Sequence, residues 1–417
     1  MAYAIGVILF AFGILVSIAL HEYGHYGTAR AFGMKVTRFF IGFGPTLFSF
    51  KRGETEYGLK GIPAGAFVKI IGMTPQDDDV PPGEEHRAMW RYPVWKRTIV
   101  LGAGSAVHFV LGFVILWGLF AFFPINEYDK LDTAPPTVRE VSKCVTLEWE
   151  IEPAGGLRQC QPGRDPASAA VAAGLQPGDT ITSLNQQPVT EWGQLTSLIR
   201  DAGGETVTLT FERDGRELSA VVTLPLAERP PENLDPQTPI TEVEPEEVGV
   251  LGITPVIPQT TIGPVGAVGE AVNRTGLVLT GTVEAMTHLP ERIPDLWTAV
   301  FGGERSPETP ISVVGASRIG GDLWAQGEVP TFLALLAALN FFVGIFNLVP
   351  LLPLDGGHIA IAWFEKARSW VYARLGRPDP GRVDYYKLMP VTYVVILIMA
   401  GFFLLTIAAD IVNPIRL

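Results

Sequence analysis

Long uninterrupted runs of apolar residues dominate the pattern along this chain. The first run covers residues 3–20, close to the N-terminus, and contains no charged residue. Three further apolar runs follow at residues 98–123, 331–352 and 391–409. Each run is near or above the length of about 20 residues that a helix needs to cross a bilayer. The pattern therefore predicts a polytopic α-helical membrane protein with four transmembrane helices.

The segments between these runs have other periodicities. Residues 53–72 alternate apolar and polar positions around glycines, which indicates β-structure too short and interrupted for a span. Residues 191–202 predict a helix, and residues 205–211 and 216–224 predict two strands joined by a hairpin turn at Asp214-Gly215. These elements predict a small α+β domain between the second and third spans.

A linker and one more helix follow this domain. Residues 227–247 are rich in Pro and Glu, which is typical of a linker, and residues 265–288 predict an interfacial rather than a spanning helix. The predicted domains are a membrane half, an α+β domain, a linker with an amphipathic helix, and a second membrane half, at residues 1–125, 126–226, 227–330 and 331–417.

Composition and charge give this arrangement an orientation. The chain has 417 residues, of which 47% are hydrophobic and 18% charged, which is too apolar for an ordinary soluble enzyme and too polar for a protein buried entirely in lipid. Residues 29–97 carry 11 Lys and Arg against 7 Asp and Glu, and residues 363–390 carry 6 against 3. Residues 126–309 carry 12 against 28. The positive-inside rule therefore places the two basic connections in the cytoplasm, with the acidic segment and both termini outside.

The first apolar run and the net charge each have an alternative explanation. A cleavable signal peptide would also be apolar, but no basic segment precedes this run and no small-residue cleavage site follows it. The net charge of -12 is concentrated in the extracytoplasmic segment and gives no indication of nucleic-acid binding.

The first candidate chemistry continues the first span directly, as His21-Glu22-Tyr23-Gly24-His25. Histidines four residues apart lie on one face of a helix, where both can bind one zinc ion, and Glu22 is placed to take a proton from water. Ionisable side chains are costly inside a membrane, so this group indicates a functional site.

A third ligand is expected at another cytoplasmic span end. The third span ends near Asp355, after Pro350 and Pro353 interrupt the helix and before Gly356-Gly357 permits a tight turn. Asp355 is therefore the candidate third metal ligand, with a helix N-cap as the alternative role.

His21-Glu22-x-x-His25 together with Asn347-x-x-Pro350-x-x-Pro353-Leu-Asp355-Gly-Gly resembles the site-2 protease family of intramembrane zinc metalloproteases, of the regulator of sigma-E protease type. The resemblance implies that zinc is bound by His21, His25 and Asp355 and that Glu22 is the general base. It places Asn347 near the scissile peptide, where it could hold the substrate backbone or the oxyanion, or else serve only in helix packing.

The same resemblance implies a family function. It predicts cleavage of transmembrane segments of single-span proteins, such as anti-sigma factors, in the bacterial cytoplasmic membrane. Residues 53–72 resemble the family's membrane re-entrant β element, which implies substrate binding at Gly61, Gly65 and Phe67 by strand addition. An ordinary amphipathic hairpin at the surface is the alternative for this segment.

The extracytoplasmic domain resembles a single PDZ domain of the bacterial protease type, on residues 167–189. Such a domain binds peptides or substrate tails by strand addition and would gate substrate access, with a structural spacer as the alternative. Cys144 and Cys160 lie near the start of this domain and are expected to form a disulfide in an oxidising compartment.

Three further polar residues, Ser105, His108 and His358, lie in or next to the predicted spans. In the second span, Ser105 and His108 depart from the family pattern, and His108 is interpreted as a packed or hydrogen-bonded histidine rather than a ligand. His358 follows Asp355 and supports either the metal site or the helix N-terminus.

The alternative functions are a catalytically inactive membrane scaffold that recruits partners through its PDZ domain, and a transporter, which a single cluster of ionisable residues disfavours.

Overall fold

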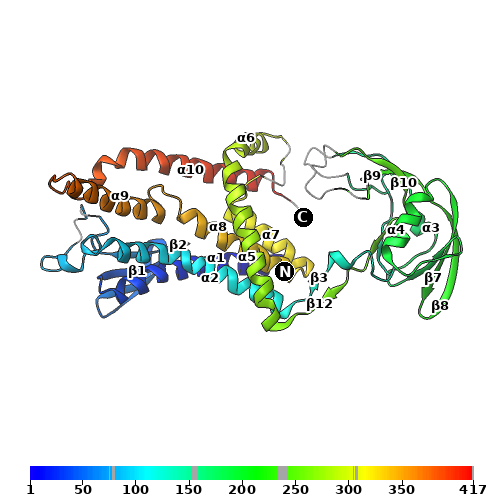
Figure 1. Cartoon of the computed structure of the whole chain (residues 1–417), viewed down its shortest axis with the longest axis horizontal. Helices are drawn as coiled ribbons and strands as arrows, with labels where there is room; N and C mark the ends of the chain where they lie inside the picture. The colour runs from blue at the N-terminus through cyan, green and yellow to red at the C-terminus, as the bar shows by residue number, and fades with distance from the viewer. Residues whose placement is uncertain are drawn as a thin grey trace. The chain divides into compact units, whose positions relative to one another are not determined.

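The computed structural model describes residues 1–74, 76–77, 80–151, 158–232, 234, 243–303, 305 and 309–415. The chain divides into two compact units (Figure 1). Met1–Phe123 and Ile262–Leu417 form the first, called here the membrane unit, and Pro124–Thr261 forms the second, called here the outer unit. The chain therefore leaves the membrane unit once and returns to it.

The four predicted spans are confirmed as four helices long and apolar enough to cross a membrane among the described residues. They are α1 (Ala2–Ala31), α2 (Val94–Phe122), α8 (Val329–Asn347) and α10 (Met389–Val412). Helix α2 is central, because it packs against α1 and α8 and also against α5 (Gly263–His288) and α9 (Asp355–Arg374). Helix α1 extends past its apolar run to Ala31, so the predicted metal ligands lie within continuous helix.

Two short helices complete the membrane unit. They are α6 (Ile293–Val300), which contacts α10, and α7 (Val313–Gln326), which packs against α1. Helix α7 begins where the Ser312 hydroxyl accepts a hydrogen bond from Val314 N–H at 3.1 Å. The predicted helix over residues 265–288 is confirmed as α5.

A buried ion pair and two hydrogen bonds join α10 to the segment that leads into α7. Arg305 Nη2 lies 2.6 Å from Asp410 Oδ1, and each side chain is 2% exposed. The second oxygen of Asp410 accepts hydrogen bonds from the backbone N–H groups of Ser312 (2.7 Å) and Gly315 (3.2 Å). A carboxylate bound to free N–H groups at a helix N-terminus is a favourable cap, so Asp410 is fully paired.

An antiparallel hairpin, β1 (Val36–Arg52) and β2 (Thr55–Ile70), lies against α1. Both strands bend, and Gly42 and Gly44 adopt the positive φ values (87° and 82°) that suit glycine. The first part of β1 therefore has a β2 neighbour on both sides. Phe39, for example, pairs with Val68 near the end of β2 and with Tyr57 near its beginning. The sequence predicted β-structure over residues 53–72 but not the partner strand β1.

The outer unit contains a four-stranded sheet in the order β6-β5-β7-β8. The strands are β5 (Thr180–Leu184), β6 (Gln187–Pro188), β7 (Thr206–Arg213) and β8 (Arg216–Thr223), and the helices are α3 (Ala169–Ala172) and α4 (Trp192–Asp201). Its core includes the fully buried side chains Ile181, Leu195, Leu209 and Leu224. The predicted helix and hairpin are confirmed, with Asp214 and Gly215 both at positive φ in the turn.

Three pairs of short strands complete the outer unit. They are β4 (Val138–Val141) with β11 (Ile253–Pro255), β9 (Leu226–Arg229) with β10 (Glu246–Gly249), and β3 (Ile125–Asn126) with β12 (Gln259–Thr260). The predicted linker over residues 227–247 thus contains strand residues at both ends, and much of its middle lies outside the described residues.

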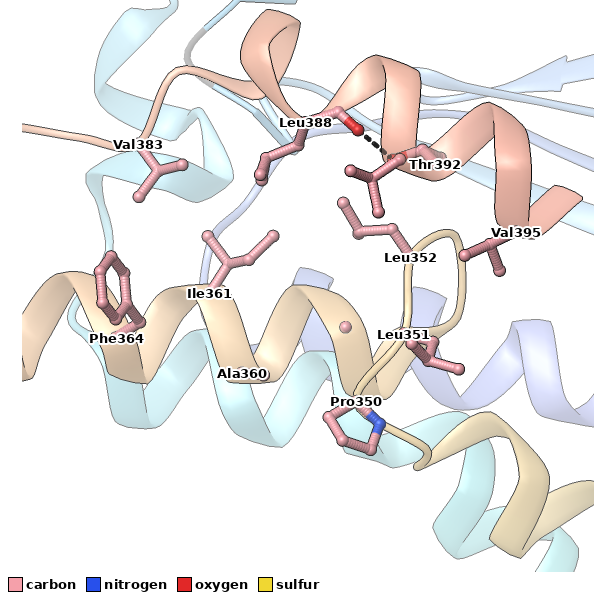
Figure 2. Close-up of a pocket in the computed structure, with 12 residues that line it drawn as sticks. Pro350, Leu351, Leu352, Ala360, Ile361, Phe364, Val383, Leu388, Thr392 and Val395 are labelled. Carbon is pink, nitrogen blue, oxygen red and sulfur yellow. Dashed lines mark hydrogen bonds between the residues drawn. The ribbon is translucent and has the colours of Figure 1, made fainter.

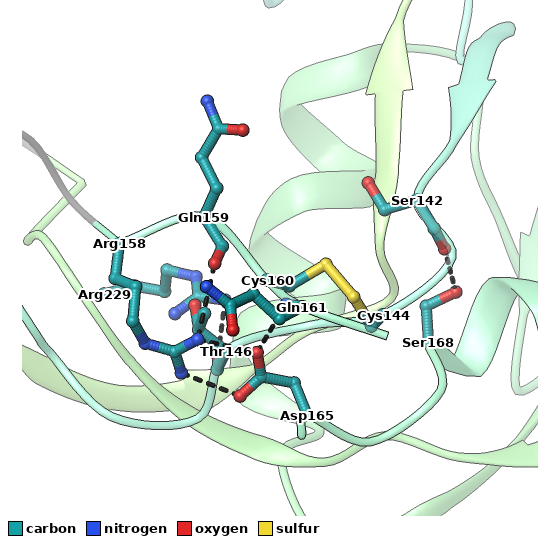
Figure 3. The surroundings of a disulfide bond; sticks show 10 residues. All are labelled: Ser142, Cys144, Thr146, Arg158, Gln159, Cys160, Gln161, Asp165, Ser168 and Arg229. Atoms are coloured by element: carbon teal, nitrogen blue, oxygen red, sulfur yellow. Dashed lines mark hydrogen bonds and ion pairs between the residues drawn. A yellow bond between two sulfur atoms is a disulfide. The ribbon is translucent and has the colours of Figure 1, made fainter. Parts of the chain in front are cut away.

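The predicted disulfide between Cys144 and Cys160 is confirmed, with the two Cα atoms 5.8 Å apart (Figure 3). Beside it, the Arg158 guanidinium donates two hydrogen bonds of 2.7 Å to the Asp165 carboxylate. These bonds and one from Gln161 N–H hold the pKa of Asp165 well below its ordinary value. The disulfide and the ion pair therefore both anchor the segment at residues 158–165.

Candidate metal centre

The two histidines of the first motif point their Nε2 atoms at one location. His21 and His25 are 7% and 6% exposed, and their Nε2 atoms are 3.0 Å apart. His25 Nδ1–H donates a hydrogen bond of 2.7 Å to the carbonyl of Val100 in α2, which leaves the Nε2 lone pair available for a metal.

Asp355, the first residue of α9, brings its carboxylate to the same location. Its Oδ2 lies 3.4 Å from His21 Nε2 and 3.3 Å from His25 Nε2. The turn lies at residues 352–354, before α9, and Gly356 and Gly357 are helical rather than forming the predicted tight turn. They are needed for close approach, because a Cβ on Gly356 would lie 2.2 Å from the Leu348 carbonyl oxygen. Glycine therefore lets the loop after α8 fold against the first turn of α9 and direct Asp355 inward.

The three donor atoms fit a zinc ion. Zinc bonds of about 2.0–2.1 Å in a tetrahedral site place neighbouring ligand atoms about 3.3 Å apart. The observed separations are 3.0, 3.3 and 3.4 Å. Two imidazole nitrogens and one carboxylate oxygen are also the ligand types of a catalytic zinc site, which keeps a fourth position for water.

Helix α2 leaves space for this centre at Gly104. A Cβ on Gly104 would lie 2.4 Å from His21 Cε1 and 2.5 Å from the Nε2 atoms of both His21 and His25. Any side chain here would therefore press on the ligand atoms themselves. The sequence did not predict Gly104 as part of the metal centre.

Glu22 faces the hairpin beside the centre. Its Oε2 accepts a hydrogen bond of 2.9 Å from Val68 N–H in β2. Phe67, a predicted substrate-binding residue, precedes Val68, and its ring stacks on Phe40 of β1 at 5.6 Å between centroids. The predicted Gly61 is exposed and Gly65 is buried, both within β2.

His108 and Asn340 form a polar pair beside His21, and nothing in the sequence indicated that these two residues meet. The His108 ring is centred 5.0 Å from that of His21, and its Nδ1–H donates a 2.9 Å hydrogen bond to Asn340 Oδ1. His108 is thus a hydrogen-bonded span histidine, as interpreted, and is adjacent to the metal centre as well. Asn347, the predicted substrate-binding residue, ends α8 and is half-buried.

An apolar pocket of about 330 Å³ lies between the loop after α8, helix α9 and helix α10 (Figure 2). Leu351, Leu352, Ile361, Phe364 and Val395 are among the residues that line it. None of its described lining residues is ionisable, so it offers space for apolar groups rather than chemistry.

An HExxH motif and a distant aspartate that converge among apolar helices define a membrane-embedded metalloprotease. The model of peptidase family M50 matches residues 9–375, and the chain belongs to this family. It is 42% identical over 423 residues to the zinc metalloprotease Rip1 of Mycolicibacterium smegmatis, and 39% identical over 422 residues to that of Mycobacterium tuberculosis, covering 100% of both chains in each case. It is 30% identical over 367 residues to a putative zinc metalloprotease of Mesorhizobium japonicum, which covers 84% of this chain and 86% of the relative. The protein is therefore an integral-membrane zinc metalloprotease.

Proposed function

We propose that this protein is an intramembrane endopeptidase that cuts the transmembrane segment of single-span membrane proteins, such as anti-sigma factors, near the cytoplasmic face. The observation that carries this proposal is the triangle of His21, His25 and Asp355 donor atoms, 3.0–3.4 Å apart, on helices that are apolar enough to cross a membrane.

In this proposal His21, His25 and Asp355 hold the zinc ion. When bound, zinc makes water more acidic and polarises the scissile carbonyl. Glu22 is the general base, because Val68 N–H holds its Oε2 and Oε1 remains to take the proton from water and return it to the leaving amide nitrogen. Asn347 binds the substrate backbone or the oxyanion.

The end of β2 is the proposed substrate clamp. A transmembrane helix has no free backbone groups, so its scissile segment must unwind before it can be cut. Val68 N–H points away from β1 toward Glu22, so this edge of β2 can add an extended segment beside the base. Gly61, Gly65 and Phe67 would contact that segment, and the hairpin would act as a membrane re-entrant element.

The proposed orientation follows the charge distribution. The metal centre, the hairpin and the connection between α9 and α10 face the cytoplasm, and the outer unit and both termini face outward. A reporter that is active only outside the cytoplasm, fused to the C-terminus, should be active. Inactivity of this fusion, with activity of a fusion after residue 80, would reverse the orientation.

Replacing the base tests the protease proposal. Glu22→Gln should abolish cleavage of a single-span substrate in reconstituted vesicles and keep a full complement of zinc, whereas Glu85→Gln, at an exposed position, should cleave like the wild type. Full activity of Glu22→Gln would remove Glu22 as the base. A purified chain that binds no zinc would instead favour the inactive scaffold. Comparing membrane proteomes with active and Glu22→Gln chains would identify substrates.

The outer unit is proposed to be a PDZ domain that gates substrate access. Its own hydrophobic core and its helix α4 beside a four-stranded sheet support a separate peptide-binding domain. Two substrates with the same transmembrane segment, one with a large folded outer domain and one trimmed to a short tail, should differ strongly in cleavage rate. Equal rates would leave the outer unit as a spacer.

A further inference from the structure

A second buried ion pair links α2, which orients His25, to α9, which carries Asp355. Arg97 of α2 places Nη1 3.0 Å from Glu365 Oε2 of α9, and these side chains are only 3% and 4% exposed. A buried pair that loses one partner leaves an uncompensated charge, so this contact strongly constrains both helices.

Each end of the pair lies on a helix that either orients or carries a proposed metal ligand. Arg97 lies one helical turn before Val100, whose carbonyl accepts the hydrogen bond from His25 Nδ1–H. Glu365 lies on α9, and α9 begins at Asp355. The pair therefore joins the helix that orients one predicted ligand to the helix that carries another.

Glu365 is the centre of a small network. Its Oε2 also accepts a 2.9 Å hydrogen bond from Arg382 Nη1, and its Oε1 accepts one of 2.9 Å from Val383 N–H. Arg382 in turn donates to the Trp90 carbonyl at 2.7 Å. Burial by itself would raise the pKa of Glu365, but these hydrogen bonds lower it overall, so the carboxylate is charged at neutral pH.

We propose that Arg97 and Glu365 are positioning residues that set the location of Asp355 relative to His21 and His25. Glu365 is ten residues after Asp355, or about 15 Å along α9. A tilt of α9 by about 4° about its Glu365 end moves Asp355 by about 1 Å over that length. Zinc–ligand distances tolerate changes of only about 0.2 Å, so a small tilt is enough to remove the carboxylate from the metal.

The other buried pair, Arg305–Asp410, provides a matched control. It is similarly buried, at 2% exposure for each side chain, but its hydrogen bonds among the described residues join α10 to the segment that leads into α7 and involve no proposed ligand. Glu365→Gln and Asp410→Asn each remove one charge with almost no change of shape. Both should lower the melting temperature of the full-length protein, whereas only Glu365→Gln should affect the metal.

The experiment measures zinc affinity of the purified full-length variants by competition with a chromogenic chelator, and the visible spectrum after Co²⁺ substitution. Glu365→Gln should weaken zinc binding by about 10–100-fold and alter the Co²⁺ spectrum, in line with other residues that support metal ligands indirectly. Asp410→Asn should match the wild type. Arg97→Lys should retain most of the affinity, because Arg97 reaches Glu365 through one nitrogen only, and Arg97→Gln should not.

Two outcomes would overturn the inference. One is a wild-type zinc affinity and Co²⁺ spectrum in Glu365→Gln. If Glu365→Gln does not fold, Arg382→Gln replaces it, because this variant removes a single bond to Glu365 from a more exposed side chain. Arg382→Gln should weaken zinc binding a few-fold, and a wild-type zinc affinity in this variant is the second outcome that would overturn the inference. The inference depends on the proposed ligand set, and His25→Ala tests that set separately, since unaltered zinc binding there would reject the ligands themselves.

Discussion

Replacing Gly104 by alanine should weaken zinc binding strongly, although alanine stabilises helix α2, which carries this position. The new Cβ would lie 2.4 Å from His21 Cε1 and 2.5 Å from His25 Nε2. These distances are about 1 Å short of ordinary carbon contacts, so both rings must move. Zinc–ligand distances tolerate about 0.2 Å, so Gly104→Ala should bind zinc about 100-fold more weakly, at the upper end of the range for altered metal surroundings.

The assay compares Gly104→Ala with Gly102→Ala, because a Cβ on Gly102 would have no atom of the described residues within 4 Å. Alanine is favoured over glycine in a helix by about 1 kcal/mol, so neither variant should unfold for reasons of helix propensity. Zinc content after dialysis and cleavage of a reconstituted substrate are measured for both. Gly102→Ala should resemble the wild type in both measurements. Retention of zinc and cleavage in Gly104→Ala would refute the placement of the centre against α2.

Three further predictions concern the cofactor and the outer unit. Zinc removal by a strong chelator should abolish cleavage, and stoichiometric zinc should restore it; recovery with no added metal would contradict the prediction. Replacing Cys144 and Cys160 by serine should destabilise the outer unit by about 3 kcal/mol, given their separation of 16 residues, as measured by denaturant titration of the full chain with and without reductant. Burial opposes ionisation of Asp179, but hydrogen bonds from Arg213 and Gln176 N–H lower the pKa of its carboxyl overall. The ionised carboxylate therefore stabilises the fold at pH values above the ordinary pKa of about 3.9, and this stabilisation is lost as the pH falls through the lowered pKa. The melting temperature of the outer unit should therefore fall in that acid range, and Asp179→Asn should show a smaller dependence there.

Much of the architecture can be predicted because its determinants are local in the sequence. The four apolar helices follow from run length, and the β7–β8 hairpin follows from Asp214-Gly215. His21, Glu22 and His25 stand together in one motif, and the loop prolines and glycines direct attention to Asp355. Each of these signals occupies a short stretch of chain and needs no knowledge of a distant partner.

The remaining features depend on how distant segments align. The strand β1 was not predicted, because its pairing with β2 is interrupted by glycine bends and shifts register several times. Gly104 matters only because α2 passes close to the face of α1 that carries both histidines. Likewise, Arg97 and Glu365 are separated by 268 residues, and nothing in either local sequence indicates the other.

The pairing of Asp410 with Arg305 also bears on how the protein is assembled. An aspartate near the end of α10 is costly to place in lipid unless a partner compensates it. Arg305 precedes Asp410 by about a hundred residues, so the cation is synthesised well before the final helix is complete. Integration of the last helix is thereby tied to the presence of a segment already inserted, and chains that have lost Arg305 should fail at this final step of biogenesis and be cleared by quality-control proteases.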